Sequence, residues 1–293
     1  MTALVSATLR QRIEETAARL EETGSESPQA EAEALLEAVT GIPQRHALYH
    51  EERDLTARES EELERLVARR LAGEPLQYIT GESAFRMLTL TTDRRALIPR
   101  PETEGLVDLA LRLEDTDASL EVLDACTGGG AVALALAMEA PAWSILAADA
   151  SPEAIELARE NHERYEMARV QWLEADVTSL GFWRMIPPLD LVVSNPPYVR
   201  TREWGVLPRE IREHEPRDAL EAGPEGMDVI GPLLEGASMR VKPSGHVLLE
   251  IGSTQAEQAE EAARSLGFHD VRVAPDLSGR PRYLISRQRA GGG

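Results

Sequence analysis

Apolar side chains recur at helical spacing through the first 72 residues, a pattern that predicts consecutive helices. The first predicted helix ends at Gly24, and its apolar face consists of Leu4, Leu9, Ile13, Ala17 and Leu20. A second helix is predicted over 28–39, with Ser27 as its cap and Gly41 at its end. Thr56 and Glu59 have the spacing of a capping box ahead of a third helix.

This helical region is acidic, with nine basic and sixteen acidic residues among positions 1–80, and it contains no glycine-rich loop. Two interpretations stay open, a packing cap on a larger domain or a docking surface for a protein partner, because both require the same apolar face. His46 and His50 stand four residues apart, but no third ligand recurs nearby, so no metal site is expected.

Glycine and proline interrupt the pattern between Gly73 and Pro101. Within that stretch the alternating run from Phe85 to Leu90 predicts a short hairpin. Pro101 then begins a helix that reaches about Leu113.

After Ser119 the pattern becomes strand and helix in alternation. Strands are predicted over 120–125, 143–148, 170–173, 189–194, 246–251, 271–274 and 283–286. Helices are predicted over 131–138, 152–163, 227–241 and 254–266. Such alternation indicates a parallel sheet with helices on both faces. Because no helix separates the last two strands, one of them is expected to insert antiparallel near an edge.

The excess of acidic residues limits which class of molecule the chain is expected to bind. The chain carries 31 basic and 51 acidic residues, a formal net charge of −20, and Lys242 is its one lysine. Such a surface repels the phosphate backbone, so a nucleic acid is disfavoured as substrate. Two alternative explanations of the acid excess stay open, adaptation to a salty cytoplasm and the base composition of the genome. The single cysteine, the lack of an apolar span and the lack of a signal-peptide core favour a cytoplasmic protein, and nothing requires more than a monomer.

Polar residues follow the first strands of the predicted sheet. Cys126-Thr127-Gly128-Gly129-Gly130 joins the first strand to a helix, and glycines there let a backbone approach a ligand closely. Asp149 ends the second strand, where a carboxylate can accept both hydroxyls of an adenosine ribose. Asp176, with Val177 beside it, follows the third strand and is placed to meet an adenine amine. Both acids are also ordinary turn residues, an interpretation that stays open.

The fourth strand ends in Asn195-Pro196-Pro197-Tyr198, the most specific feature of the chain. An amide or aryl amine is a poor nucleophile because its lone pair is delocalised. The Asn195 oxygen and the Pro196 carbonyl can each accept one N–H, which turns that lone pair toward an incoming methyl group. Proline contributes no N–H donor, and Tyr198 offers a flat face for stacking. This pattern suits methylation of a planar NH2 group.

The loop at 195–198 resembles that of amino-methyltransferases that use S-adenosylmethionine on adenine N6 or glutamine N5. Three further stretches are similar to the release factor glutamine methyltransferase (PrmC/HemK) family. They are GEPLQYITG at 73–81, LIPRPETE at 97–104, and EPRDAL at 215–220, which leads to Gly226-Met227. With the acidic helical region, the resemblance covers essentially the whole chain.

The resemblance implies an α/β fold, a seven-stranded class I S-adenosylmethionine-dependent methyltransferase (Rossmann-like) domain with an N-terminal helical-bundle domain. The expected boundaries are 1–80 for a helical substrate-docking domain, 81–100 for a hairpin linker and 101–293 for the methyltransferase domain. The implied reaction methylates the glutamine of the Gly-Gly-Gln motif in peptide chain release factors and leaves S-adenosylhomocysteine. Residues 126–130, Asp149 and Asn195 would contact the cofactor, and Asn195 to Tyr198 would hold the glutamine amide.

Cys126 departs from the family, which usually has glycine there. Its side chain is expected either to crowd the methionine part of the cofactor or to require a negative φ. Two other functions stay open. One is an adenine-N6 methyltransferase of DNA or RNA that stacks the base on Tyr198, although the N-terminal region lacks the basic surface expected of it. The other is a protein-binding adaptor that keeps the fold without activity.

Overall fold

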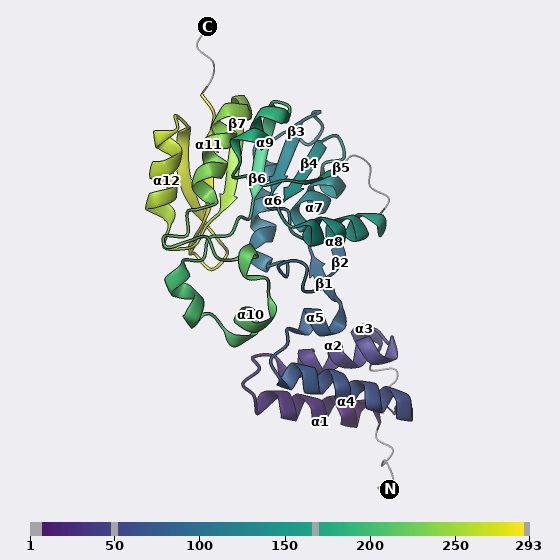
Figure 1. Ribbon diagram of the computed structural model, residues 1–293. Helices are drawn as coiled ribbons and strands as arrows, with labels where there is room; N and C mark the ends of the chain where they lie inside the picture. The colour runs from purple at the N-terminus through teal and green to yellow at the C-terminus, as the bar shows by residue number, and fades with distance from the viewer. Residues whose placement is uncertain (1–7, 48–51, 166–169, 290–293) are drawn as a thin grey trace. The chain divides into compact units, whose positions relative to one another are not determined.

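The computed structural model describes residues 8–47, 52–165 and 170–289 and divides the chain into two compact units, drawn in Figure 1. The smaller unit consists of the described part of Met1–Glu82 together with Pro208–His214, and the larger one of the described parts of Ser83–Leu207 and Glu215–Gly293. This grouping differs from the predicted division at two places. The hairpin belongs to the larger unit instead of standing apart as a linker, and the segment 208–214 belongs to the smaller one.

The smaller unit is helical. Its helices are α1 (Leu9–Glu21), α2 (Pro28–Thr40), α3 (Gln44–Ala47), α4 (Ala57–Leu71), α5 (Leu76–Thr80) and α10 (Arg209–His214). Leucines from α1, α2 and α4 form its core, where Leu20, Leu35 and Leu63 are almost completely buried. The predicted face residue Leu4 and the histidine His50 lie outside the described residues. The short helix α10 ends at His214.

Two of the predicted helix starts differ in how they are capped. Thr56 and Glu59 form the expected capping box, in which the Thr56 hydroxyl accepts the Glu59 N–H at 3.2 Å and Glu59 accepts the Thr56 N–H at 2.8 Å. Ser27 stands at the N-cap of α2, but its side chain makes no capping hydrogen bond, so that prediction is wrong in its chemistry. Gly41 ends α2 with φ of 69°, the left-handed conformation that glycine adopts at low cost.

The larger unit begins with the predicted hairpin. Strands β1 (Glu82–Phe85) and β2 (Leu88–Thr91) pair with each other, and their buried residues Phe85, Leu88 and Leu90 join the main core. The hairpin therefore belongs to the fold of this unit because its apolar face is buried there.

A seven-stranded sheet forms the centre of the larger unit, in the order β5-β4-β3-β6-β7-β9-β8. Its strands are β3 (Glu121–Ala125), β4 (Ser144–Asp149), β5 (Val170–Glu174), β6 (Leu189–Ser194), β7 (Val241–Glu250), β8 (His269–Pro275) and β9 (Pro281–Arg287). The first five are parallel, whereas β9 lies antiparallel between β7 and β8. The predicted antiparallel insertion near one edge is confirmed.

Two hydrophobic cores cover the two faces of this sheet. Val122 packs in one core with α6 (Pro101–Leu113) and α7 (Ala131–Glu139), and its neighbour Leu123 packs in the other. The second core is completed by α9 (Leu180–Met185), α11 (Ile230–Arg240) and α12 (Ala256–Ser265). Because successive residues of a strand point to opposite faces, buried strands covered on both sides are apolar throughout.

The remaining elements connect these layers. Helix α8 (Pro152–Glu163) contacts β4 and β5, and the short 3-10 helices η2 (Thr201–Val206) and η3 (Arg217–Ala219) lie between β6 and α11. Strand β7 starts at Val241 instead of the predicted His246, directly after α11. Within the described ranges, no helix has both the length and the hydrophobicity needed to cross a bilayer.

Candidate active site

A cavity of about 500 Å³ lies in the larger unit at the carboxyl ends of the parallel strands. The predicted residues that line it are Cys126, Thr127, Gly128, Gly129, Asp149, Asp176, Val177, Asn195 and Pro197. Gly130, Pro196 and Tyr198 are outside that lining. Parallel strands end at the same edge of a sheet, and β4, β3 and β6 are neighbours, so residues distant in sequence meet here.

The glycine-rich loop joins β3 to α7 through left-handed backbone. Gly128 has φ of 55° and Gly130 has φ of 86°. A Cβ at Gly130 would lie 2.8 Å from the Trp172 ring, so glycine is required there for packing. A Cβ at Gly128 would meet only the Cβ of Ala96, 4.0 Å away, which means that the Gly128 backbone opens toward the cavity.

Cys126 adopts φ of 57°, so the expectation that this cysteine requires a negative φ is wrong. A side chain in the left-handed region costs about 1–2 kcal/mol relative to glycine, and the surrounding loop imposes that conformation. Burial and the nearby carboxylate of Asp149 raise the pKa of the Cys126 thiol. The sulfur is therefore a neutral thiol and a weak nucleophile at neutral pH.

Asp149 connects two segments of the cavity floor. Its Oδ2 accepts the N–H of Gly128 at 2.8 Å, and its Oδ1 accepts the N–H of Ser151 at 2.9 Å. Burial raises the pKa of the Asp149 carboxyl, and these backbone donors partly offset that effect. Asp149 is therefore a turn residue, because its carboxylate accepts a backbone N–H in the turn before α8, and the same carboxylate also lines the cavity.

Asp176 has the geometry of a turn acid at the rim. Its Oδ1 accepts the Thr178 N–H at 2.8 Å and the Thr178 hydroxyl at 2.6 Å. The neighbouring Val177 is buried. Asp176 and Val177 both line the cavity, so their side chains lie on one wall of it.

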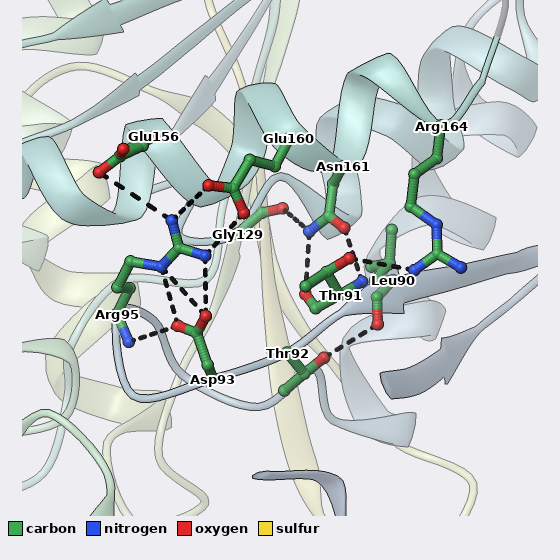
Figure 2. A network of polar contacts seen from close by, with 10 residues as sticks. All are labelled: Leu90, Thr91, Thr92, Asp93, Arg95, Gly129, Glu156, Glu160, Asn161 and Arg164. Carbon is green, nitrogen blue, oxygen red and sulfur yellow. Dashed lines mark hydrogen bonds and ion pairs between the residues drawn. The ribbon is translucent and has the colours of Figure 1, made fainter. Parts of the chain in front are cut away.

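A buried asparagine of α8 connects the hairpin to the glycine-rich loop, as Figure 2 shows. Asn161 donates to the carbonyl oxygens of Gly129 at 3.0 Å and Thr91 at 3.1 Å, and its Oδ1 accepts the Thr91 N–H at 2.7 Å. Nearby, the guanidinium of Arg95 bridges Asp93 at 2.8 Å and Glu160 at 2.7 Å. The chain that follows the hairpin is thereby tied to α8, next to the glycine-rich loop.

The same chain continues along the cavity as residues 95–100, where buried Glu215 holds it. The Glu215 carboxylate accepts the N–H of Ile98 at 3.3 Å and a guanidinium N–H of Arg100 at 2.5 Å. Ile98 and Arg100 belong to one stretch of the family resemblance and Glu215 to another, so these two stretches are joined at the cavity wall.

The side-chain amide of Asn195 is oriented by Thr103 of α6. Asn195 Nδ2 donates to the Thr103 hydroxyl at 3.1 Å, and that hydroxyl donates to Oε2 of Glu250 at 2.7 Å. Within the described part of the chain, no donor occupies Asn195 Oδ1. The loop thus presents an amide oxygen that can accept a hydrogen bond from a bound molecule.

Tyr198 is held from both ends. Its hydroxyl donates to Oε1 of Glu250 at 3.2 Å, and its carbonyl accepts from the side chain of Gln255 at 3.0 Å. Burial, followed by the negative charge of Glu250, raises the pKa of the Tyr198 phenol, which is therefore neutral in this fold. A Cβ at Gly226 would lie 2.3 Å from the Tyr198 carbonyl oxygen, so this loop also depends on a glycine distant in sequence.

Thr103, Asn161 and Glu250 were not singled out by reasoning from the sequence. A signal existed for Glu250, since an acid that directly follows the apolar run Val247-Leu248-Leu249 at the end of a strand points to a strand-end site. Thr103 lies within the stretch LIPRPETE at 97–104, and Asn161 is a polar residue at a buried position of a helix. Their roles depend on contacts between distant segments, which spacing along the chain does not reveal.

Two family models match the chain, one described as PrmC N-terminal domain over residues 11–81 and one as methyltransferase domain over residues 122–214. The release factor glutamine methyltransferase of Deinococcus radiodurans is 39% identical over 288 residues, covering 97% of this chain and 99% of that protein. The proteins of that name from Moorella thermoacetica and Koribacter versatilis are 38% and 37% identical over 284 residues, each covering 96% of this chain and 99% of the relative.

A solved methyltransferase from Pyrococcus furiosus has the same fold, with a TM-score of 0.51 and 19% identity over 76% of this chain and 97% of that one. The predicted α/β methyltransferase fold is confirmed by this likeness and by the observed sheet. Identity above one third along nearly the full length, in both directions, places the chain in a family as well as in a fold. The chain belongs to the release factor glutamine methyltransferase family.

Proposed function

We propose that this chain transfers a methyl group from S-adenosylmethionine to the glutamine of the Gly-Gly-Gln motif of peptide chain release factors. The observation that carries the proposal is the orientation of the Asn195 side-chain amide directly after β6. Its nitrogen donates a hydrogen bond to Thr103, which leaves its oxygen able to accept a hydrogen bond from a substrate. Its position beside the glycine-rich loop supports transfer to an amide nitrogen. The named relatives support a release factor as substrate.

The cavity fits a nucleoside cofactor at three points. The Gly128 backbone opens into it, the Asp149 carboxylate lines it, and the wall at Asp176 and Val177 offers an acceptor next to an apolar surface. We assign the ribose hydroxyls to Asp149, the adenine to the wall at Val177, and the remaining contacts to the loop 126–130 and Asn195. When bound, S-adenosylmethionine supplies an electrophilic methyl group on a sulfonium centre.

The residues 195–198 would hold the glutamine carboxamide by its two N–H groups. Asn195 Oδ1 accepts one and the Pro196 carbonyl accepts the other, so the nitrogen lone pair faces the methyl group. Transfer would form the nitrogen–carbon bond as the carbon–sulfur bond breaks, and a proton would leave the nitrogen for water. Holding nitrogen, carbon and sulfur in line is the main source of acceleration in such a site. The products are N5-methylglutamine and S-adenosylhomocysteine.

Tyr198 and the smaller unit would serve the substrate in different ways. The Tyr198 ring is proposed to stack on the carboxamide, with its hydroxyl anchored at Glu250. The helical unit is proposed to dock the release factor, acting as a monomer. A net charge of −20 supports a protein over a nucleic acid as the direct substrate, because a phosphate backbone would be repelled.

Mass spectrometry tests the proposal directly. A release factor incubated with the chain and S-adenosylmethionine should gain one methyl group on the Gly-Gly-Gln glutamine. A release factor with alanine in place of that glutamine should gain none. Asn195→Ala should lower the rate at least about 100-fold while the protein stays folded. Methyl transfer to duplex DNA or ribosomal RNA instead of the release factor would overturn the proposal.

A further inference from the structure

Glu250 is a carboxylate placed where a strand otherwise buries apolar side chains. It ends β7, is 1% exposed, and follows the buried residues Leu248 and Leu249. Burying a carboxylate is costly unless hydrogen bonds satisfy its oxygens. Each oxygen of Glu250 has one hydroxyl partner, Thr103 at Oε2 and Tyr198 at Oε1. The side chain therefore joins α6 to the loop after β6.

The hydroxyl of Thr103 has one proton, and Glu250 accepts it at 2.7 Å. A hydroxyl whose proton is engaged can only accept from its other neighbours. Asn195 lies 3.1 Å away and must then present its NH2 group to Thr103 rather than its oxygen. The carboxylate thus determines, through one intervening hydroxyl, which end of the Asn195 amide faces the cavity.

Reversal of the Asn195 amide would place a donor where a substrate amide also has donors. A rotated Asn195 would repel an incoming N–H group instead of accepting it. The same carboxylate holds the Tyr198 hydroxyl from its other oxygen, so the two side chains assigned to the substrate share one anchor.

We propose that Glu250 and Thr103 are positioning residues that hold Asn195 Oδ1 and the Tyr198 ring in the orientation that receives the substrate amide. This inference rests on the proposed function for its kinetic consequences, whereas the orientation of Asn195 can be measured without catalysis. Glu250 acts only through Thr103 and Tyr198, and no direct contact with substrate is assigned to it.

Charged groups on neighbouring elements face Glu250. Arg282 of β9 favours its ionised form, whereas Glu102 of α6 opposes it, and the Tyr283 phenol of β9 also lies within its field. Burial outweighs the hydrogen bonds and raises the pKa of Glu250. A protonated Glu250 can donate a hydrogen bond to the Thr103 hydroxyl, and that hydroxyl can then donate its own hydrogen bond to Asn195 instead of accepting one. The direction of both hydrogen bonds therefore reverses as the pH falls, and activity is expected to fall with the pH.

The test uses full-length variants with release factor as substrate. Thr103→Val removes the intervening hydroxyl and should lower kcat by roughly 100-fold, and Glu250→Gln should lower kcat by roughly tenfold or more. Thr103→Ser restores the hydroxyl and should recover most of the activity. Ser286→Ala is the matched control, because Ser286 is a buried hydroxyl of β9 without a partner in the described chain. Its kcat should match wild type.

Three further readouts separate positioning from general damage. The KM for release factor and the calorimetric Kd for S-adenosylhomocysteine should change less than about threefold in Glu250→Gln. The acid limb of the kcat–pH profile should be present in wild type and absent in that variant. Nuclear magnetic resonance should show the Asn195 side-chain NH2 protected from hydrogen exchange in wild type and in Thr103→Ser, and exposed in Thr103→Val.

The outcomes are distinct. Wild-type protein that transfers no methyl group contradicts the proposed function, and the exchange measurement then still decides the orientation of Asn195. Active wild type together with unchanged kcat in Thr103→Val and Glu250→Gln contradicts the positioning role alone. Equal exchange of the Asn195 amide in all variants contradicts it as well.

Discussion

The side-chain amide of Asn161 donates to the carbonyl oxygen of Gly129 across 3.0 Å, which connects α8 to the loop assigned to the cofactor. Asn161 is 1% exposed, and its two other hydrogen bonds engage the backbone of Thr91. One buried side chain thus holds three backbone groups from two segments. Gly128 and Gly130 have positive φ, and glycine can adopt many other backbone conformations. The hydrogen bond from Asn161 to Gly129, which lies between them, therefore limits the conformations that the loop can adopt.

Asn161→Ala is expected to weaken cofactor binding about tenfold, which corresponds to about 1.4 kcal/mol. The substitution leaves half-buried backbone groups of Gly129 and Thr91 without their side-chain partner, and each such group costs about 1–3 kcal/mol where water does not replace it. Calorimetry with S-adenosylhomocysteine measures the affinity. Arg164→Ala removes a more exposed hydrogen bond to the Thr91 hydroxyl and serves as the control, with an expected change below about 0.5 kcal/mol. Equal affinity in Asn161→Ala and wild type would contradict the argument.

The sequence pattern predicts the part of this site that depends on strand ends. The glycine-rich loop, Asp149 and Asn195 follow β3, β4 and β6, and parallel strands end together, so their meeting follows from topology alone. Glu250 obeys the same rule, but recognising it required the knowledge that β7 neighbours β6. Asn161 and Thr103 lie within helices, where periodicity indicates a buried face and not the partner it meets.

The short elements were the hardest part of the fold to predict. Helices α9 and α10 have six residues each, which is too few for apolar periodicity to reveal. Residues 208–214 group with the N-terminal helices, and Arg70 pairs across that grouping with Glu210, 140 positions away. Pairings between such distant segments have no local signature.

Cys126→Gly is expected to bind the cofactor at least as tightly as wild type. Cys126 occupies φ of 57°, a conformation that glycine adopts without the cost of about 1–2 kcal/mol that other residues carry. Glycine loses the half-buried cysteine side chain and adds about 0.5–1 kcal/mol of unfolded-state entropy, so the free energy of unfolding should change by less than about 1 kcal/mol. Calorimetry and urea unfolding give the two values. Cys126→Val, a β-branched residue at the same φ, should be clearly less stable.

We expect the free energy of unfolding to depend on pH through the buried carboxyl of Asp124. Burial raises the pKa of its carboxyl to about 7, against hydrogen bonds from Thr127 and Ala133 that favour the ionised form. The folded protein therefore binds a proton at Asp124 between about pH 4 and pH 7 that the unfolded chain releases. The contribution of Asp124 to the free energy of unfolding is greatest at low pH and falls as pH rises through 7, by up to about 4 kcal/mol.

The comparison of wild type with Asp124→Asn isolates this effect. The amide oxygen of asparagine can accept both hydrogen bonds, but the side chain does not titrate. Urea unfolding at pH 5 and pH 8 should therefore show wild type losing more stability than the variant as the pH rises. Buried acids whose charge does not act on Asp124, such as Glu250, titrate in both proteins and cancel in the difference, whereas the coupling of Asp124 to Asp149 remains in it. Parallel pH dependences in the two proteins would show that Asp124 is ionised throughout.

We expect the ion pairs of Arg70 to hold the segment 208–214 to the N-terminal helices. Its guanidinium pairs with Glu31 at 2.7 Å and with Glu210 of α10 at 2.6 Å, and it is only 15% exposed. Glu210→Gln removes one charge from this group and should cost about 1 kcal/mol or less in global stability, because Glu210 itself is 40% exposed. The local effect should be larger, since α10 has only six residues and Arg70 pairs directly with one of them.

Hydrogen exchange followed by mass spectrometry measures that local effect. Peptides covering Arg209 to His214 should exchange several-fold faster in Glu210→Gln than in wild type, while peptides of α4 should keep their rates. Glu213→Gln is the control, because Glu213 pairs with Arg209 inside the same helix and does not contact Arg70. If both variants accelerate exchange equally, the helix is held by its own charges and not by Arg70. High salt should reproduce the Glu210→Gln result in wild type only weakly, because the buried guanidinium of Arg70 is poorly screened.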